Sequence, residues 1–164
     1  GDGLASVGVT AFAGNFAGQL DRVELPAEGR RLRQADQGWS LVSKGGRRLE
    51  LAMPIEGRVL AVNPEVVRDP TLLQRRPYDL GWILRVKPRD PAGSRRNLFS
   101  LSAAQAWIDA AKNAVTSRLA NVSTVTAYDG GEWVQGFGEW LEDGDWSELR
   151  HELFPELPAR PDQD

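Results

Sequence analysis

The stretch Met53–Lys87, MPIEGRVLAVNPEVVRDPTLLQRRPYDLGWILRVK, contains two short runs rich in branched apolar residues, separated by a loop that Pro and Asp punctuate. The flanking runs, Arg58–Val62 and Gly81–Val86, have the composition of β-strands. Between them, Pro64 and Pro70 each stand where a helical turn begins, a position at which the missing N–H of proline costs nothing. The stretch therefore predicts a strand, two short helical turns and a second strand.

The residues upstream of this stretch continue the β pattern. Short apolar runs alternate with Gly, Asp and Pro, and the last of them has the two-residue period of a half-buried strand. The expected strands lie in Leu4–Val9, Gln19–Leu25, Trp39–Val42 and Arg48–Leu51. A set of short strands of this kind is typical of a small sandwich or barrel, so the fold is expected to be mainly β.

Downstream, the pattern changes to a helical period. Ser102 is expected to cap a helix that begins at Ala103. Apolar residues then recur at spacings of three and four, which gives one apolar stripe that we expect to pack on the β core. The residues of the stripe are Ile108, Ala111, Val115 and Leu119.

The last part of the chain, residues 121–164, is expected to form a small helical extension with a frayed tail. Val122–Tyr128 is β-branched and strand-like, whereas Trp133–Leu141 places its aromatic residues on one helix face. Asp145 and Glu148 have the spacing of a capping box, which predicts a further short helix through Trp146 and Leu153.

The six tryptophans fall into two groups. Trp39, Trp82 and Trp107 lie in predicted strands or the predicted helix, so we expect them in the core. The others crowd into the extension, and the favoured interpretation is a mini-core against the β domain, because each has apolar companions at helical spacing. The alternative is an aromatic patch for a protein partner, formed by Trp133, Trp140 and Trp146.

Composition narrows the function classes. The chain has 164 residues, of which 41% are hydrophobic, and a net charge of −3, so no basic field is expected to hold nucleic acid or an anionic membrane. The absence of cysteine excludes disulfides, thiolate nucleophiles and cysteine-ligated metals, and it fits a cytoplasmic protein. No apolar run has the length of a membrane span.

Candidate catalytic and metal-binding residues are few. The single histidine, His151, lies in an amphipathic helical segment and is interpreted as a surface residue. Glu142, Asp143 and Asp145 form an acidic cluster that reads better as turn and N-cap chemistry than as paired catalytic carboxylates. No phosphate-binding loop, dinucleotide fingerprint or nucleophile elbow is present, so we expect neither an enzyme nor a metal site.

Two segments, read as strings, resemble one family, the glycine cleavage system H proteins. They are Met53–Lys87 and Ser6–Pro26, SVGVTAFAGNFAGQLDRVELP. The resemblance implies a lipoyl-type fold: a flattened β-barrel, or barrel-sandwich hybrid, over residues 1–120 with a packed C-terminal helix, followed by the extension at 121–164. It also implies that residues 6–26 contain the family's first hairpin and a short turn, and that family members carry a further strand upstream of Gly1.

The resemblance implies lipoate, attached by an amide to a lysine at the tip of an exposed hairpin. The family's spacing, counted back from Pro54, lands on Gly46, whereas counting forward from Glu24-Leu25-Pro26 lands on Gly45. The nearest lysine is Lys44, next to Gly45-Gly46, which we expect to form a type I′ turn with Lys44 at the strand end. Lys44 is thus the candidate lipoyl attachment site, displaced from the family position.

Two functional hypotheses follow from this displacement. In the first, Lys44, Arg47 and Arg48 are a solvated basic turn, no cofactor is bound, and the domain acts through protein contacts as an adaptor or regulatory paralogue. In the second, Lys44 is lipoylated and shuttles an aminomethyl group in the glycine cleavage system or a related lipoate-dependent pathway. Both imply protein partners, by resemblance the glycine cleavage enzymes or other lipoate-dependent enzymes, and neither involves nucleic acid or a membrane.

Overall fold

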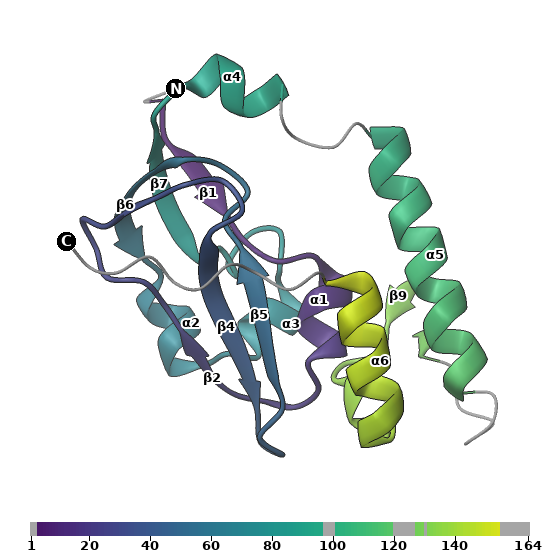
Figure 1. Ribbon diagram of the computed structural model, residues 1–164. Helices are drawn as coiled ribbons and strands as arrows, with labels where there is room; N and C mark the ends of the chain where they lie inside the picture. Colours follow the sequence, from purple (N-terminus) through teal and green to yellow (C-terminus); the bar gives the residue numbers. More distant parts are fainter. Residues whose placement is uncertain (1–2, 97–100, 120–126, 130, 155–164) are drawn as a thin grey trace.

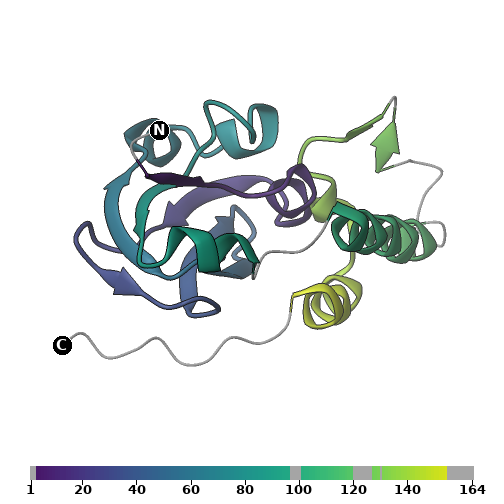
Figure 2. The same cartoon turned by 90° about the horizontal axis from the view of Figure 1, so that it is seen from above.

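The computed structural model describes residues 3–96, 101–119, 127–129 and 131–154 (Figure 1). Within these ranges the chain forms a four-stranded and a three-stranded antiparallel sheet and a separate two-stranded pair. The helices at Leu101–Leu119 and Asp143–Leu153 lie to one side of the two larger sheets, as Figures 1 and 2 show. The sheets are not joined into a closed barrel. The mainly β prediction of a flattened two-sheet body with helices toward the C-terminus is confirmed.

The first sheet contains both strands of the stretch Met53–Lys87. Its strand order is β1 (Ala5–Val7), β7 (Leu84–Pro88), β6 (Gly57–Val62) and β3 (Arg31–Leu32). Alternate residues point inward, as the two-residue strand period requires, so Val59 of β6 and Leu84 and Val86 of β7 are buried, whereas the residues between them are exposed. The short strand β3 was not predicted.

The second sheet has the order β2 (Leu20–Glu24), β4 (Gln37–Ser43) and β5 (Arg48–Ala52). β4 is the central strand, and all of its residues from the second onward are buried. Leu41 lies opposite Leu49 on β5, and both are fully buried. The predicted strands at 19–25, 39–42 and 48–51 are therefore confirmed within a few residues at their ends.

The two helical turns predicted within Met53–Lys87 are also confirmed. They are α2 (Pro64–Arg68) and α3 (Leu72–Arg75). The side chain of Asn63 caps α2 by accepting a hydrogen bond from Glu65 N at 3.0 Å, and its amide donates to the carbonyls of Leu80 and Trp82 at 2.9 and 2.8 Å. Asn63 thereby ties both ends of the loop together.

Residues 6–26 depart from the expected hairpin. A helix, α1 (Ala11–Phe16), lies between β1 and β2, and the Thr10 side chain caps it by accepting a hydrogen bond from Ala13 N. The prediction of a hairpin is wrong because this short segment has a good N-cap, and because five of its six residues are buried among elements far away in the sequence. Such burial cannot be read from the local pattern.

The C-terminal elements begin with α4 (Pro91–Arg96) and α5 (Leu101–Leu119). The helix predicted from Ala103 is confirmed, but it begins two residues earlier, at Leu101, with Ser102 inside it. Ala111, Val115 and Leu119 are buried as the stripe predicts. The helix packs against α6 (Asp143–Leu153), and its Trp107 contacts Phe12 of α1, so it lies beside the sheets and not flat on one (Figures 1 and 2). Among the helices of the described ranges, none combines the length and apolar content that crossing a bilayer requires.

The extension differs in detail from its predicted elements. Trp133–Leu141 is not a regular helix face: a short strand β9 (Glu132–Trp133), paired with β8 (Tyr128–Asp129), precedes a 3-10 helix η1 (Phe137–Trp140). The capping box at Asp145 is wrong, because α6 (Asp143–Leu153) starts earlier with Glu142 as its N-cap residue and Asp145 within its first turn. Residues 122–126 and the tail from Pro155 lie outside the described residues.

The tryptophans of the extension pack against the β domain, as expected, but they join the main hydrophobic cluster and do not form a mini-core of their own. Trp146 is 6% exposed and its Nε1 donates to Phe16 O at 2.8 Å, while Trp133 and Trp140 pack at the edge of the same cluster. Trp39 is buried and Trp107 packs against the core, as predicted. The prediction for Trp82 is wrong: it is half-buried, and the guanidinium of Arg85 lies 4.6 Å from its ring centroid.

Candidate functional site: the β4–β5 hairpin

The candidate attachment site, Lys44, lies in the hairpin that joins β4 to β5. This hairpin has a three-residue loop, Lys44–Gly46. Ser43 N donates to Arg47 O at 2.9 Å, and Ser43 O accepts a hydrogen bond from Gly46 N at 3.0 Å. Gly46 has φ of +89°, whereas Gly45 is not left-handed. This is a type I turn followed by a glycine bulge, so the predicted type I′ turn at Gly45-Gly46 is wrong.

Lys44 is exposed at the first position of this loop. Its backbone N–H donates to Gln19 O at 2.8 Å, which continues the pairing of β4 with β2 and fixes the start of the loop. Within the described residues, no hydrogen bond or ion pair holds its ammonium group. Gly45 occupies the middle of the loop and Gly46 its end, so neither position reached by the family's spacing carries a side chain.

The other end of the loop is held by Arg47. Its guanidinium donates to the carbonyl oxygens of Gly138 at 2.7 Å and Leu141 at 2.6 Å, and it pairs with Asp143 at 2.9 Å. The guanidinium carbon lies 5.4 Å from the ring centroid of Trp146. The side chain is 16% exposed, so the interpretation of Arg47 as part of a solvated turn is wrong.

Glu139 of the extension makes a second contact beside the hairpin. Its carboxylate accepts a hydrogen bond from Gln19 N at 2.9 Å, at the start of β2. A Cβ placed on Gly45 would lie 3.9 Å from Glu139 Oε2, so the carboxylate borders the loop itself. Together, Arg47 and Glu139 fasten η1 and the start of α6 to one flank of the loop. In Figure 1, α6 lies to the right of β5.

Sequence reasoning missed both fastening residues. Arg47 and Glu139 are separated by more than ninety positions along the chain, and nothing in either local pattern distinguishes them from other surface charges. The one available signal was Gly138, because a Cβ there would overlap Phe16 O, and a glycine inside an aromatic-rich segment indicates close approach of another backbone.

Arg48, the first residue of β5, faces the other side of the hairpin. It pairs with Glu24 of β2 across the central strand β4. The hydrogen bond from Arg48 is the largest cause that lowers the pKa of the Glu24 carboxyl, and the positive charge of Arg22 adds to it. The pair keeps Glu24 ionised and holds the hairpin on β2.

A small apolar cavity of about 300 Å³ lies at the end of β4 and β5 that is away from the hairpin loop. Trp39, Leu51, Trp107 and Phe154 contribute to its walls. Trp39 is 3% exposed, and its Nε1 has no hydrogen-bond partner in the described part of the chain. A buried N–H without a partner costs free energy, which the packing around Trp39 must offset.

The remaining candidate residues have ordinary surroundings. His151 is exposed on α6, where its Nδ1 donates to Ser147 O at 2.8 Å. Glu142 and Asp143 lie at the start of α6, and Asp143 contacts Arg47. In the ranges that the structure covers, no group of three or more histidine or carboxylate side chains is placed to hold a metal ion.

Comparisons with known proteins agree with this two-sheet body. The family model for the glycine cleavage H-protein matches residues 1–112. The chain is 36% identical over 103 residues to the glycine cleavage system H protein of Magnetococcus marinus, with 63% of this chain and 72% of that protein covered. It is 41% identical over 86 residues to the H protein of Gloeobacter violaceus, with 52% and 66% covered.

A solved structure has the same fold. The crystal structure of a glycine cleavage system H protein from Mycobacterium marinum matches with a TM-score of 0.51 and 28% identity, over 58% of this chain and 82% of that one. The segment that fastens the hairpin, η1 and α6, lies beyond residue 112 and thus outside the part that the family model matches. The chain belongs to the glycine cleavage H-protein family.

Proposed function

We propose that this chain is an H-protein-like domain that is not lipoylated and that acts through protein contacts, as an adaptor or regulatory paralogue. The observation that carries the proposal is the loop itself. Its last two residues are glycines, and its flank is occupied by η1 and α6 through Arg47 and Glu139. A lipoyl arm needs a lysine on a freely approachable turn, because it must enter both the modifying enzyme and each partner's active site.

The second candidate is a lipoyl carrier modified at Lys44. The exposure of Lys44, and the lack of any described contact of its ammonium, favour this alternative. In that case the domain would shuttle an aminomethyl group in the glycine cleavage system or a related lipoate-dependent pathway. The two candidates differ in one observable, the covalent state of Lys44.

Intact mass spectrometry distinguishes them. The chain is co-expressed with lipoate and a lipoate ligase from its own host, beside the Magnetococcus marinus H protein as the positive control and Lys44→Ala as the negative one. We expect the control protein to gain a lipoyl group and this chain to remain unmodified. A lipoyl increment on the wild type that disappears in Lys44→Ala would refute the adaptor proposal and establish the carrier.

If the wild type is unmodified, Gly46→Lys, which places a lysine at the position counted back from Pro54, tests whether the missing lysine is the cause. If the missing lysine is the only defect, Gly46→Lys gains lipoate. If Gly46→Lys stays unmodified while the control protein is modified, the missing lysine is not the only obstacle, and either the flank contacts of Arg47 and Glu139 or the left-handed backbone at position 46 opposes modification.

A further inference from the structure

The outer face of the four-stranded sheet carries a row of cations. Arg31 on β3 lies directly opposite Arg58 on β6, and Arg58 lies directly opposite Lys87 on β7. Neighbouring strands are about 4.8 Å apart, so three like charges follow one another across three strands. Like charges in directly opposite positions destabilise a sheet. The row therefore opposes folding unless an anion neutralises it.

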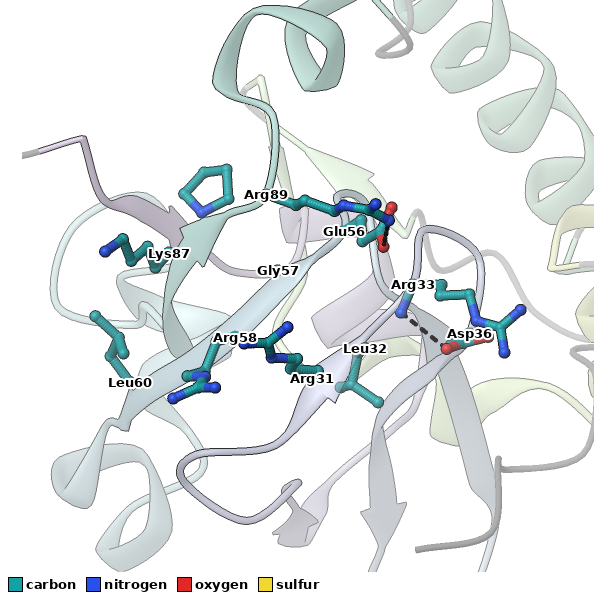
Figure 3. A pocket seen from close by; sticks show the side chains of 11 residues that line it. Arg31, Leu32, Arg33, Asp36, Glu56, Gly57, Arg58, Leu60, Lys87 and Arg89 are labelled. Carbon is teal, nitrogen blue, oxygen red and sulfur yellow. Dashed lines mark hydrogen bonds and ion pairs between the residues drawn. The ribbon is translucent and has the colours of Figure 1, made fainter. Parts of the chain in front are cut away.

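These residues line a groove of about 860 Å³ (Figure 3). Its two carboxylates are already engaged: Glu56 pairs with Arg89 at 3.0 Å, and Asp36 accepts a hydrogen bond from Arg33 N at 2.8 Å. For Arg31, Arg58 and Lys87, no carboxylate within the described ranges lies at ion-pairing distance. The groove is thus a local excess of positive charge on a chain whose net charge is −3.

We propose that this groove binds an acidic segment of a partner protein. Carboxylates of the segment would neutralise Arg31, Arg58 and Lys87, and an apolar side chain would cover Leu60, which is 41% exposed at the side of the groove. A protein segment fits better than a nucleic acid, because no aromatic side chain lines the groove to stack on a base. The negative charge of the rest of the chain also repels a long polyanion.

The groove is separate from the hairpin and its flanking extension. β6 lies at the far side of the molecule from α5 and α6, as both views show (Figures 1 and 2). The inference goes beyond the proposed function, because an adaptor and a lipoyl carrier would both retain this face. Its test therefore does not depend on the state of Lys44.

Fluorescence anisotropy with a labelled peptide of alternating Glu and Leu tests the proposal on the full chain. We expect the wild type to bind, with an affinity that falls as salt is added. Arg58→Gln removes the central charge and is expected to weaken binding roughly tenfold, whereas Arg58→Lys retains most of the affinity. Arg22→Gln is the matched control, since Arg22 is an exposed arginine on the other sheet.

Three results would overturn the proposal. The wild type does not bind the acidic peptide; Arg22→Gln weakens binding as much as Arg58→Gln does; or single-stranded oligothymidylate competes with the peptide at lower concentration than an unlabelled copy of the peptide. Far-UV circular dichroism of each variant confirms that a loss of binding is not a loss of fold.

Discussion

Arg47 joins the hairpin to a segment of the chain more than ninety residues away. Its contacts differ in how much each contributes to the stability of the fold. Asp143 is 96% exposed on its side chain, so its ion pair with Arg47 is screened by water and contributes little. The two backbone carbonyls are part-buried and receive charge-assisted hydrogen bonds at 2.7 and 2.6 Å. The carbonyl contacts are therefore the ones that hold the extension in place.

This ranking predicts the outcome of two substitutions. Arg47→Met keeps most of the apolar stem but leaves the carbonyls of Gly138 and Leu141 without their donor, so we expect a loss of about 2 kcal/mol in the free energy of unfolding. Asp143→Asn removes only the exposed ion pair and should cost less than about 0.5 kcal/mol. Urea unfolding measures both, and an equal cost would contradict the ranking.

Glu24 is responsible for a part of the pH dependence of the protein's folding stability. Its pKa is lowered chiefly by the hydrogen bond from Arg48, so the folded state binds this proton less readily than the unfolded state. Such a group stabilises the fold above its ordinary pKa of 4.5, and the contribution is lost as pH falls through the lowered value.

We therefore expect wild-type Tm to fall between about pH 5 and about pH 2, and Glu24→Gln to fall less steeply over the same range. Thermal melts followed by circular dichroism at a series of pH values provide the measurement. Parallel curves for the two proteins would mean that the Glu24–Arg48 pair adds nothing to stability.

At the scale of elements, the two glycines of the hairpin loop differ in backbone conformation. Gly46 has φ of +89° and open space where a Cβ would stand, so only backbone strain opposes a side chain there. At Gly45, a Cβ would make ordinary contacts, 3.8 Å from Ser43 Oγ and 3.9 Å from Glu139 Oε2. The two positions are thus a matched pair, one conformationally restricted and one not.

We expect Gly46→Ala to lower the free energy of unfolding by about 1 kcal/mol, because an L-residue pays that cost in the left-handed region. Gly45→Ala should be neutral or slightly stabilising, because alanine restricts the unfolded chain more than glycine does. Urea unfolding of both variants tests the loop type: equal losses would restore the two-residue turn that the sequence predicted.

The cationic row across β3, β6 and β7 also acts at the scale of an element. Arg58 lies between Arg31 and Lys87, so its charge is opposed on both sides. Arg58→Gln is expected to raise the free energy of unfolding by about 0.2 to 1 kcal/mol at low salt, and the gain should shrink as salt is added. Arg58→Lys keeps the charge and should show no such gain. A destabilised Arg58→Gln would show that the row contributes packing rather than repulsion.

At the scale of the whole molecule, α1 connects the sheets to the extension. Phe12 contacts Trp107 and Trp133 with ring centroids 5.6 and 4.9 Å apart, and Phe16 stacks on Trp146 at 5.3 Å. These residues belong to the same hydrophobic cluster as the residues between the two sheets. The extension therefore has no separate core within the described ranges.

This shared cluster predicts one cooperative unfolding transition. Near-UV circular dichroism, which follows the aromatic residues, and far-UV circular dichroism, which follows the backbone, should give the same urea midpoint. Gly138→Ala should separate the two midpoints, because a Cβ there overlaps Phe16 O and forces η1 away from α1. Wild-type aromatic signal lost at lower urea than the backbone signal would show that the extension unfolds independently.

The residue types of neighbouring positions were enough to predict the strands and helical turns of Met53–Lys87. β-branched runs specify strands, and Pro64 beside an Asn63 cap specifies a helical turn, because these effects act within a few residues. The two-residue period also indicated the inward and outward faces of β5. The same locality explains the errors: α1 depends on burial against distant elements, and β3 is too short for a pattern.

The sequence by itself determined a mainly β chain of the glycine cleavage H-protein family with Lys44 beside a pair of glycines, because strand period, turn residues and motif order are all properties of neighbouring positions. Only the tertiary structure decided what surrounds that loop. Arg47, Glu139 and the row of Arg31, Arg58 and Lys87 meet their neighbours through folding alone, since their partners are far apart along the chain and their residue types are those of any exposed surface.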